Sequence, residues 1–106
     1  MSELLVLTEE NYEKEIAAPE PMVVDFYADW CMPCKAMAPV FDRVAGEYGG
    51  RVRFAKIDVD QSKQLAIKNK VLSIPTLLFF KGGEVADRVS GPIDAVQLKN
   101  RIDALL

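Results

Sequence analysis

The sequence predicts an α/β fold in which helices cover both faces of a mixed sheet of about five strands. Short apolar segments typical of strands alternate along the chain with segments whose apolar residues recur at helical spacing. Near the C-terminus, Lys81-Gly82-Gly83-Glu84 joins two strand-like segments as a tight antiparallel hairpin. The chain has 106 residues, which is enough for one domain with its own core, so we expect a single domain over residues 1–106.

The N-terminal part begins with a short apolar strand over residues 4–7. Thr8 is a favoured N-cap residue, and the acidic segment after it predicts a helix through residue 16. Two prolines between residues 17 and 21 end that helix. Residues 22–28 form an apolar run interrupted by Asp25, which fits a strand covered on both faces.

The longest predicted helix follows the second cysteine and ends at Gly49-Gly50. Its core candidates lie at helical spacing: Met37, Val40, Phe41 and Val44. Residues 52–59 then alternate apolar and polar side chains as a third strand, and residues 61–69 form a short helix. That short helix has few residues to bury: Leu65, Ala66 and Ile67.

The C-terminal part predicts strands over residues 76–80 and 85–90, followed by an amphipathic helix over residues 94–106. This last helix offers a set of apolar side chains to the core: Val96, Leu98, Ile102, Leu105 and Leu106. Strands linked by helices should run parallel, whereas the two strands of the final hairpin should be antiparallel.

Cys31 and Cys34 are the only cysteines, and they lie where a predicted strand gives way to a helix. A helix N-terminus leaves backbone N–H groups unpaired and so favours the thiolate, which is the nucleophilic form of cysteine. Pro33 suits the first helical position, where its missing N–H costs nothing. We therefore expect an exposed nucleophile at Cys31, a shielded resolving thiol at Cys34, and thiol–disulfide exchange as the chemistry.

A metal site or a structural disulfide would account less well for the cysteine pair. Zinc and iron–sulfur sites usually need four Cys or His ligands, and this chain has two cysteines and no histidine. We expect no metal site within one chain, although a metal shared between two copies stays open. A purely structural disulfide would close too small a ring to restrict the unfolded chain much. The absence of histidine also excludes Cys–His and Ser–His catalytic pairs.

Composition argues against several other classes of function. The net charge is −3, and no basic cluster indicates binding to nucleic acid or to a membrane surface. No apolar stretch reaches membrane-spanning length, and residues 1–7 lack the features of a signal peptide. The default location is the cytoplasm, where a Cys-x-x-Cys pair is more often catalytic or metal-binding than structural.

The chain resembles the thioredoxin family over essentially its whole length. The resemblance rests on motifs in the family's order: Asp25-Phe26-Tyr27-Ala28, Trp30-Cys31-Met32-Pro33-Cys34-Lys35, Pro39, Lys56-Ile57-Asp58, Ser73-Ile74-Pro75-Thr76, Lys81-Gly82-Gly83-Glu84 and Gly91. It implies a three-layer α/β sandwich and a protein-disulfide reductase that a separate, thioredoxin-reductase-type enzyme recharges. The other partners would be disulfide-containing proteins, no cofactor would be bound to the chain itself, and the default state is a monomer.

Asp25 and Lys56 are the next candidates. Taken alone, a carboxylate or a lysine in a strand usually faces solvent. The large apolar neighbours of Asp25 instead favour burial, which raises a carboxyl pKa and lets the group hold and pass a proton near neutrality. The resemblance implies that Asp25 deprotonates Cys34 when the mixed disulfide is resolved, and that Lys56 lies nearby and modulates the titration of Asp25.

The remaining candidates would contact the substrate. Pro75 can simply begin a strand, but the resemblance implies a cis Ile74–Pro75 bond that packs against the sulfurs while Ile74, Pro75 and Thr76 bind an extended peptide. Trp30, directly before Cys31, would shield the disulfide and pack on the substrate. Gly91 would form a bend after the last strand and line the substrate groove.

Met32-Pro33 departs from the Gly-Pro that thioredoxins mostly carry between the cysteines. Both residues lie inside the redox ring, so they can tune the balance between dithiol and disulfide, and Met32 adds an adaptable apolar surface beside Cys31. Pro33 stands where oxidases and isomerases of the family usually have His, which favours a reductant. Two alternatives stay open: a binding module with incidental or metal-bridging cysteines, and an oxidase or isomerase.

Overall fold

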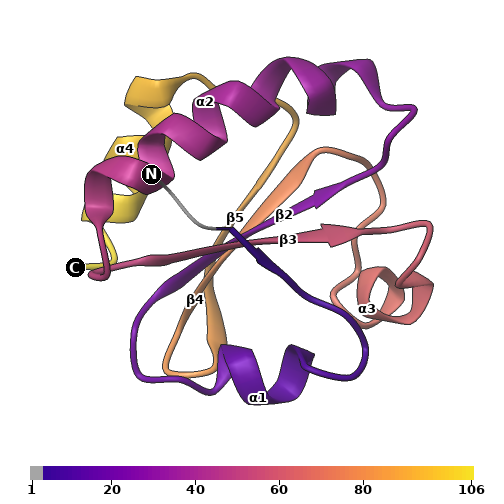
Figure 1. The fold of residues 1–106 in the computed structure, drawn as a ribbon, viewed down its shortest axis with the longest axis horizontal. Helices are drawn as coiled ribbons and strands as arrows, with labels where there is room; N and C mark the ends of the chain where they lie inside the picture. Colours follow the sequence, from indigo (N-terminus) through magenta and orange to yellow (C-terminus); the bar gives the residue numbers. More distant parts are fainter. Residues whose placement is uncertain (1–3) are drawn as a thin grey trace.

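The computed structural model describes residues 4–106, which form a five-stranded sheet and four helices (Figure 1). In chain order the elements are β1 (Leu5–Val6), α1 (Tyr12–Ile16), β2 (Met22–Tyr27), α2 (Met32–Tyr48), β3 (Arg53–Asp58), α3 (Lys63–Lys68), β4 (Thr76–Lys81), β5 (Glu84–Ser90) and α4 (Ala95–Asp103). The strand order is β1-β3-β2-β4-β5. β1 and β2 both pair in parallel with β3, whereas β4 is antiparallel to β2 and β5 is antiparallel to β4. The predicted mixed α/β sheet is confirmed.

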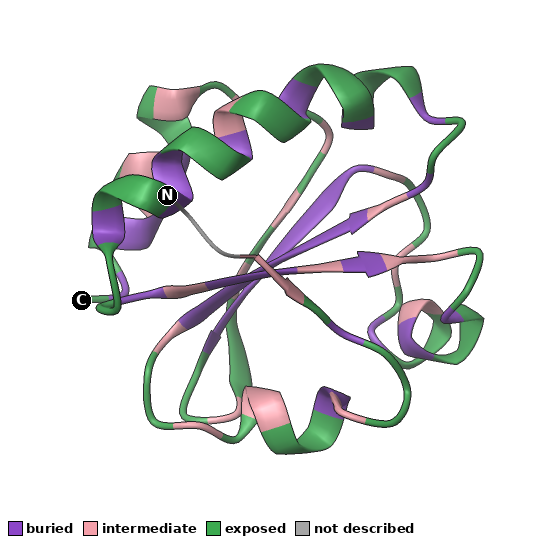
Figure 2. Ribbon diagram, in the orientation of Figure 1, coloured by how far each residue is buried: buried purple, intermediate pink, exposed green. Residues whose placement is uncertain are grey.

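The helices cover both faces of this sheet, α2 and α4 on one side and α1 and α3 on the other (Figure 1). Alternate residues of each strand face opposite sides, which divides the core in two. Beneath α2 and α4 lies one cluster of buried side chains, which includes Val23, Phe41, Val44, Phe54, Leu77, Phe79, Leu98 and Ile102. Beneath α1 and α3 lies a second cluster, which includes Leu7, Tyr12, Val24, Phe26, Ile57, Leu65, Leu78 and Phe80. β2 and β4 are buried along most of their length, which explains their nearly continuous apolar runs (Figure 2).

The direction of β4 differs from the prediction that strands linked by helices run parallel. α3 links β3 to β4, yet β4 runs antiparallel to β2, and β2 is parallel to β3. The reason is that α3 does not carry the chain back along the sheet. Its six residues span about 9 Å, whereas returning along the sheet to start a parallel strand requires about 20 Å. The chain therefore stays at the carboxyl ends of β2 and β3, and β4 begins there with Thr76.

The N-terminal helix begins later than predicted, because Thr8 is not its N-cap. The side chain of Asn11 accepts the backbone N–H of Thr8, and the Thr8 hydroxyl oxygen accepts the N–H of Glu10. These local bonds hold residues 8–11 in a turn, so α1 begins at Tyr12. At the other end of the chain, Asp94 caps α4 in a capping box with Gln97.

Three apolar side chains predicted for the core face outward instead: Ile67, Val96 and Leu106. α3 contributes Leu65 as its buried residue, and α4 contributes Leu98 and Ile102, with Leu105 just beyond it. A short helix that packs along one line on a sheet buries only a narrow stripe, and residues next to that stripe stay exposed. The four core candidates of α2 do face the sheet, since Met37, Phe41 and Val44 are buried and Val40 packs against them.

α2 runs from Met32 to Tyr48 and continues through Pro39. It ends where Gly49 adopts a positive φ of 58°, in agreement with the predicted stop at Gly49-Gly50. Among the described residues, no helix combines the length and the apolar character needed to cross a bilayer.

Candidate active site

The site lies where β2 ends and α2 begins. Cys31 follows the strand in an extended conformation, with φ −88° and ψ 109°, and serves as the N-cap of α2. Its Sγ accepts the backbone N–H of Cys34 at 3.2 Å, and its carbonyl accepts the N–H of Lys35 at 3.1 Å. The two sulfurs are joined as a disulfide, with the Cα atoms 5.2 Å apart. The N–H of Cys34, which has no partner within the helix backbone, therefore points at the sulfur of Cys31, and the N-terminal end of α2 favours negative charge there.

Cys31 is less exposed than the sequence suggests. Its exposed fraction is 4%, close to the 3% of Cys34, so the predicted contrast between an exposed and a shielded cysteine is wrong for this disulfide form. The disulfide turns both side chains into a small apolar cluster with Ala28, against which Tyr27, Val59 and Ile74 pack. The exposed side chains next to Cys31 in the chain are those of Trp30 and Met32, and we refer to these two residues as the rim.

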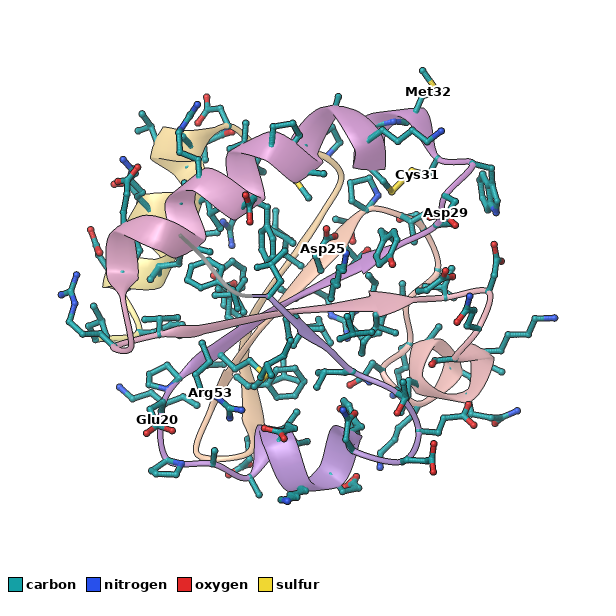
Figure 3. The ribbon with its side chains drawn as sticks, viewed as in Figure 1. Glu20, Asp25, Asp29, Cys31, Met32 and Arg53 are labelled. Carbon is teal, nitrogen blue, oxygen red and sulfur yellow. A yellow bond between two sulfur atoms is a disulfide. The ribbon has the colours of Figure 1, made fainter. Side chains whose placement is uncertain are left out.

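Trp30 directly precedes Cys31, and Met32 directly follows it. Met32 is 71% exposed and points away from the start of α2 (Figure 3), and Trp30 is 68% exposed. Because α2 begins at Met32, Pro33 occupies the second helical position and not the first. A missing N–H is tolerated there for the same reason, since none of the first four N–H groups of a helix has an intrahelical partner.

The Trp30 side chain is anchored by a residue from another part of the chain. Its Nε1 donates to Oδ2 of Asp60 at 2.8 Å, and Asp60 in turn donates its backbone N–H to Oδ1 of Asp58. This contact ties the indole, which follows the end of β2, to the loop after β3.

Asp25 lies between α2 and the sheet (Figure 3) and is 5% exposed. In the sheet it stands next to Lys56 of β3 on one side and Leu77 of β4 on the other. A cavity of about 200 Å³ joins Asp25 to Cys34, and Lys56 also lines it. Among the described residues, no hydrogen-bond partner of Asp25 Oδ1 is present.

The surroundings of Asp25 favour its neutral form. Burial raises the pKa of Asp25 to about 7, and the nearby charge of Lys56 opposes that rise. A carboxyl group with this pKa exchanges its proton readily near neutral pH, and the cavity gives it access to Cys34. The structure thus brings the predicted Asp25, Lys56 and Cys34 together.

The loop before β4 lies against the same site. The Ile74–Pro75 peptide bond is cis, Ile74 packs on the cysteine cluster and Pro75 is buried. The carbonyl of Pro75 accepts the backbone N–H of Gly91 at 2.8 Å, and the hydroxyl of Thr76 donates to the carbonyl of Ser73 at 2.6 Å. Gly91 has a φ of +93°, which other residues rarely adopt. Of the predicted substrate positions, Ile74 and Gly91 are half-buried, whereas the side chains of Pro75 and Thr76 are buried. The hydrogen bond from Gly91 to Pro75 joins this loop to the end of β5.

Sequence reasoning missed two residues of the site, Tyr27 and Asp60. Tyr27 lines the cavity, and the Lys56 ammonium lies 5.6 Å from the centroid of its ring. The two-residue period of a strand could have found it, because Tyr27 must share the face of β2 that carries Asp25. No comparable signal exists for Asp60, since its contact with Trp30 depends on how the loop after β3 folds back.

A metal centre would need several ligands gathered in one place. Within residues 4–106, no group of three or more His, Cys, Asp or Glu side chains is arranged to hold a metal ion. The groups that the site does bring together are its two sulfurs, the buried carboxyl of Asp25 and the ammonium of Lys56.

Comparison with known proteins agrees with this geometry. A family model described as Thioredoxin matches residues 3–104. The chain is 40% identical to a thioredoxin from Allochromatium vinosum over 99 residues, which cover 92% of each protein. It is 41% identical to thioredoxin C-2 from Corynebacterium nephridii over 97 residues, covering 91% of this chain and 90% of that protein. It is 36% identical to thioredoxin 1 from Nostoc sp. over 104 residues, covering 97% of each. The match spans the whole described fold and includes the cysteine pair at the start of α2, so the chain belongs to the thioredoxin family of thiol–disulfide oxidoreductases.

Proposed function

We propose that the chain reduces disulfides in other proteins, with Cys31 as the attacking and Cys34 as the resolving residue. The Cys31 thiolate attacks one sulfur of a target disulfide, which forms a mixed disulfide and releases the other target sulfur as a thiolate. The Cys34 thiolate then attacks Cys31 Sγ, forms the Cys31–Cys34 disulfide and releases the second target sulfur. Two electrons pass to the target, and its thiolates take up two protons.

The observation that carries this assignment is the position of Cys31 as N-cap of α2. Its sulfur accepts the N–H of Cys34 and lies at the positive end of the helix, which stabilises a thiolate at Cys31 before attack. Cys34 lies one turn further into the helix and lines the cavity that Asp25 shares.

Asp25 would act on the second step. As a carboxylate it would accept the proton of the Cys34 thiol through the cavity, because a thiol must lose its proton before it can attack. Lys56, its neighbour on β3, would lower the pKa of Asp25 and so widen the pH range in which the carboxylate form is available.

The target peptide would bind over the exposed rim of the site. Trp30 and Met32 supply exposed apolar surface, and Ile74, Pro75, Thr76 and Gly91 supply a rigid loop beside the sulfurs. An extended peptide can pair with such a loop in the manner of an added strand. Met32 and Pro33 would in addition set the balance between dithiol and disulfide, since both belong to the redox ring.

The oxidised chain would be recharged by a separate enzyme of the thioredoxin-reductase type, which would supply the cofactor-borne electrons. The chain would work as a monomer in the cytoplasm, where the glutathione and thioredoxin systems keep thiols reduced. Targets would be proteins with accessible disulfides and not nucleic acids or membranes.

Trapping of mixed disulfides tests the assigned roles. Cys34→Ser should retain target proteins covalently through Cys31, and dithiothreitol should release them, because attack occurs and resolution does not. Cys31→Ser is the matched control and should retain almost none. Equal retention by the two variants would contradict the roles, and no retention by either would contradict a disulfide-exchange function.

A further inference from the structure

Tyr27 and Lys56 meet on the face of the sheet that carries Asp25. Tyr27 follows Asp25 by two residues on β2, so both side chains project toward α2. Lys56 stands next to Asp25 on β3, and its ammonium lies 5.6 Å from the centre of the Tyr27 ring. That separation is within the range over which an aromatic face attracts a cation.

We propose that Tyr27 is a positioning residue whose ring holds the Lys56 ammonium beside the cavity that joins Asp25 to Cys34. The proposal rests on the proposed function, because it concerns the group that would accept the Cys34 proton. It adds a third residue to the Asp25–Lys56 pair and explains what keeps the flexible Lys56 side chain near Asp25.

A lysine side chain has a long, flexible stem, so its ammonium spreads over many positions unless something holds it. Attraction to an exposed aromatic ring raises the population of an ammonium held over the ring by a factor of about two to five, relative to the positions away from it. Tyr27 is half-buried and packs against the cysteine cluster, so its ring is itself fixed. Burial raises the pKa of its hydroxyl, as do the carboxylates of Asp58, Asp29 and Asp25, which keeps the ring uncharged near neutral pH.

The charges around the cavity determine which way the ammonium moves when the ring is removed. Asp58 lies two residues beyond Lys56 on the same face of β3 and stands next to Tyr27 in the sheet. Asp29, after β2, and Lys35, on α2, also line the cavity, whereas β4 presents the apolar Leu77 to Asp25. Without the ring, the ammonium should move toward Asp58 and solvent, away from the buried Asp25. Asp25 would then lose part of the positive field that favours its carboxylate.

The test is an NMR titration of the Asp25 carboxyl carbon in the oxidised protein, carried out with four variants. Tyr27→Phe keeps the ring, Tyr27→Leu removes it but keeps an apolar side chain, and Lys56→Met removes the ammonium. The fourth variant combines Tyr27→Leu with Lys56→Met. We expect Tyr27→Leu to raise the pKa of Asp25 by a resolvable fraction of the rise caused by Lys56→Met, and Tyr27→Phe to leave the pKa at the wild-type value. In the Lys56→Met background, Tyr27→Leu should cause no further rise.

Three results would overturn the proposal. The first is an unchanged pKa of Asp25 in Tyr27→Leu, and the second is a fall in that pKa. The third is a rise of the same size when Tyr27→Leu is introduced into the wild type and into Lys56→Met, which would mean that the ring acts by desolvation alone. Should Tyr27→Leu fail to fold, the wild-type protein gives a second measurement. The ε-methylene protons of Lys56 should be shifted upfield by the ring, and unshifted signals would equally refute the contact. Neither measurement uses a target disulfide, so its outcome is independent of the trapping experiment.

Discussion

Asp25 and Cys34 line the same cavity of about 200 Å³, one from the middle of β2 and the other from the first turn of α2. A cavity of this size has room for water between the carboxyl group and the sulfur. The sheet beneath it and the helix above it leave Asp25 only 5% exposed, so the proton that Asp25 holds is kept apart from bulk solvent. The cavity therefore connects a proton acceptor to the resolving cysteine, Cys34.

The first prediction concerns stability and pH. Burial raises the pKa of Asp25 to about 7 in the folded chain, from 3.8 for a free carboxyl, so folding favours the protonated form. The free energy of unfolding of the wild type should therefore fall as the pH rises from about 4 to about 7, and this contribution should then level off. Asp25→Asn removes this titration. The free energy of unfolding of the variant minus that of the wild type should therefore increase by on the order of 4 kcal/mol between pH 4 and pH 8.

Denaturant unfolding of both oxidised proteins across this pH range gives the measurement. Comparison of the two proteins at each pH cancels the titration of all other groups, and the low-pH end serves as the control. A difference in stability that does not depend on pH would mean that Asp25 is ionised at the same pH in the folded and unfolded chains.

The second prediction concerns the anchoring of Trp30. Trp30 Nε1 donates to Asp60 Oδ2 at 2.8 Å, and both residues are exposed. Asp60→Ala should therefore change the free energy of unfolding by less than about 0.5 kcal/mol. It should nevertheless raise KM for a protein disulfide several-fold, because the indole is no longer held in place, and leave kcat nearly unchanged.

Asp60→Asn is the matched control for this contact, since the amide oxygen can still accept the indole N–H. Its KM should lie near the wild-type value. If Asp60→Ala and Asp60→Asn raise KM equally, the charge of Asp60 and not the hydrogen bond is what matters for binding.

The third prediction concerns Gly91, whose φ of +93° follows β5. Gly91→Ala should destabilise the fold by about 1–2 kcal/mol through backbone strain alone, because an added Cβ would meet no atom within 4 Å. The strain should also weaken the hydrogen bond from Gly91 to Pro75, and hence slow reduction of a protein substrate. Thermal or denaturant unfolding measures the first effect and insulin reduction the second.

Gly50→Ala is the matched control, since an added Cβ there would also meet open space but no positive φ is required. Its stability should change by less than about 0.5 kcal/mol. Similar losses for the two variants would show that the cost does not come from the left-handed backbone at Gly91.

Local patterns were sufficient to predict most of the fold. The apolar run around Asp25, the helical spacing from Met37 to Val44 and the Gly82-Gly83 turn each correspond to an observed element. What they did not predict depends on how elements meet. β4 runs antiparallel because α3 does not carry the chain back along the sheet, and β4 therefore begins at the carboxyl end of β2. Ile67, Val96 and Leu106 face outward because their helices bury only a narrow stripe.

In the candidate site, too, local motifs predicted some residues, whereas features that depend on how separate segments meet were not predicted. Cys31, Cys34, Asp25 and Lys56 were identified from motifs, and the register of β2 and β3 brings Asp25 and Lys56 side by side. The burial of Cys31 was not predicted, because it depends on Ile74, Val59 and Tyr27 closing around the disulfide from three different segments. Asp60 was missed for a similar reason, since the loop that carries it meets Trp30 only in the folded chain.

The most direct test of the central claim is the reduction potential of the Cys31–Cys34 pair. Equilibration of the protein in defined thiol–disulfide buffers, followed by Trp30 fluorescence and by thiol counting, gives this potential. We predict a single two-electron transition more reducing than the cytosolic glutathione pool, which lies at about −220 to −260 mV by extraction. A clearly more oxidising transition would make the chain an oxidase or isomerase, and the absence of any transition would contradict a redox function altogether.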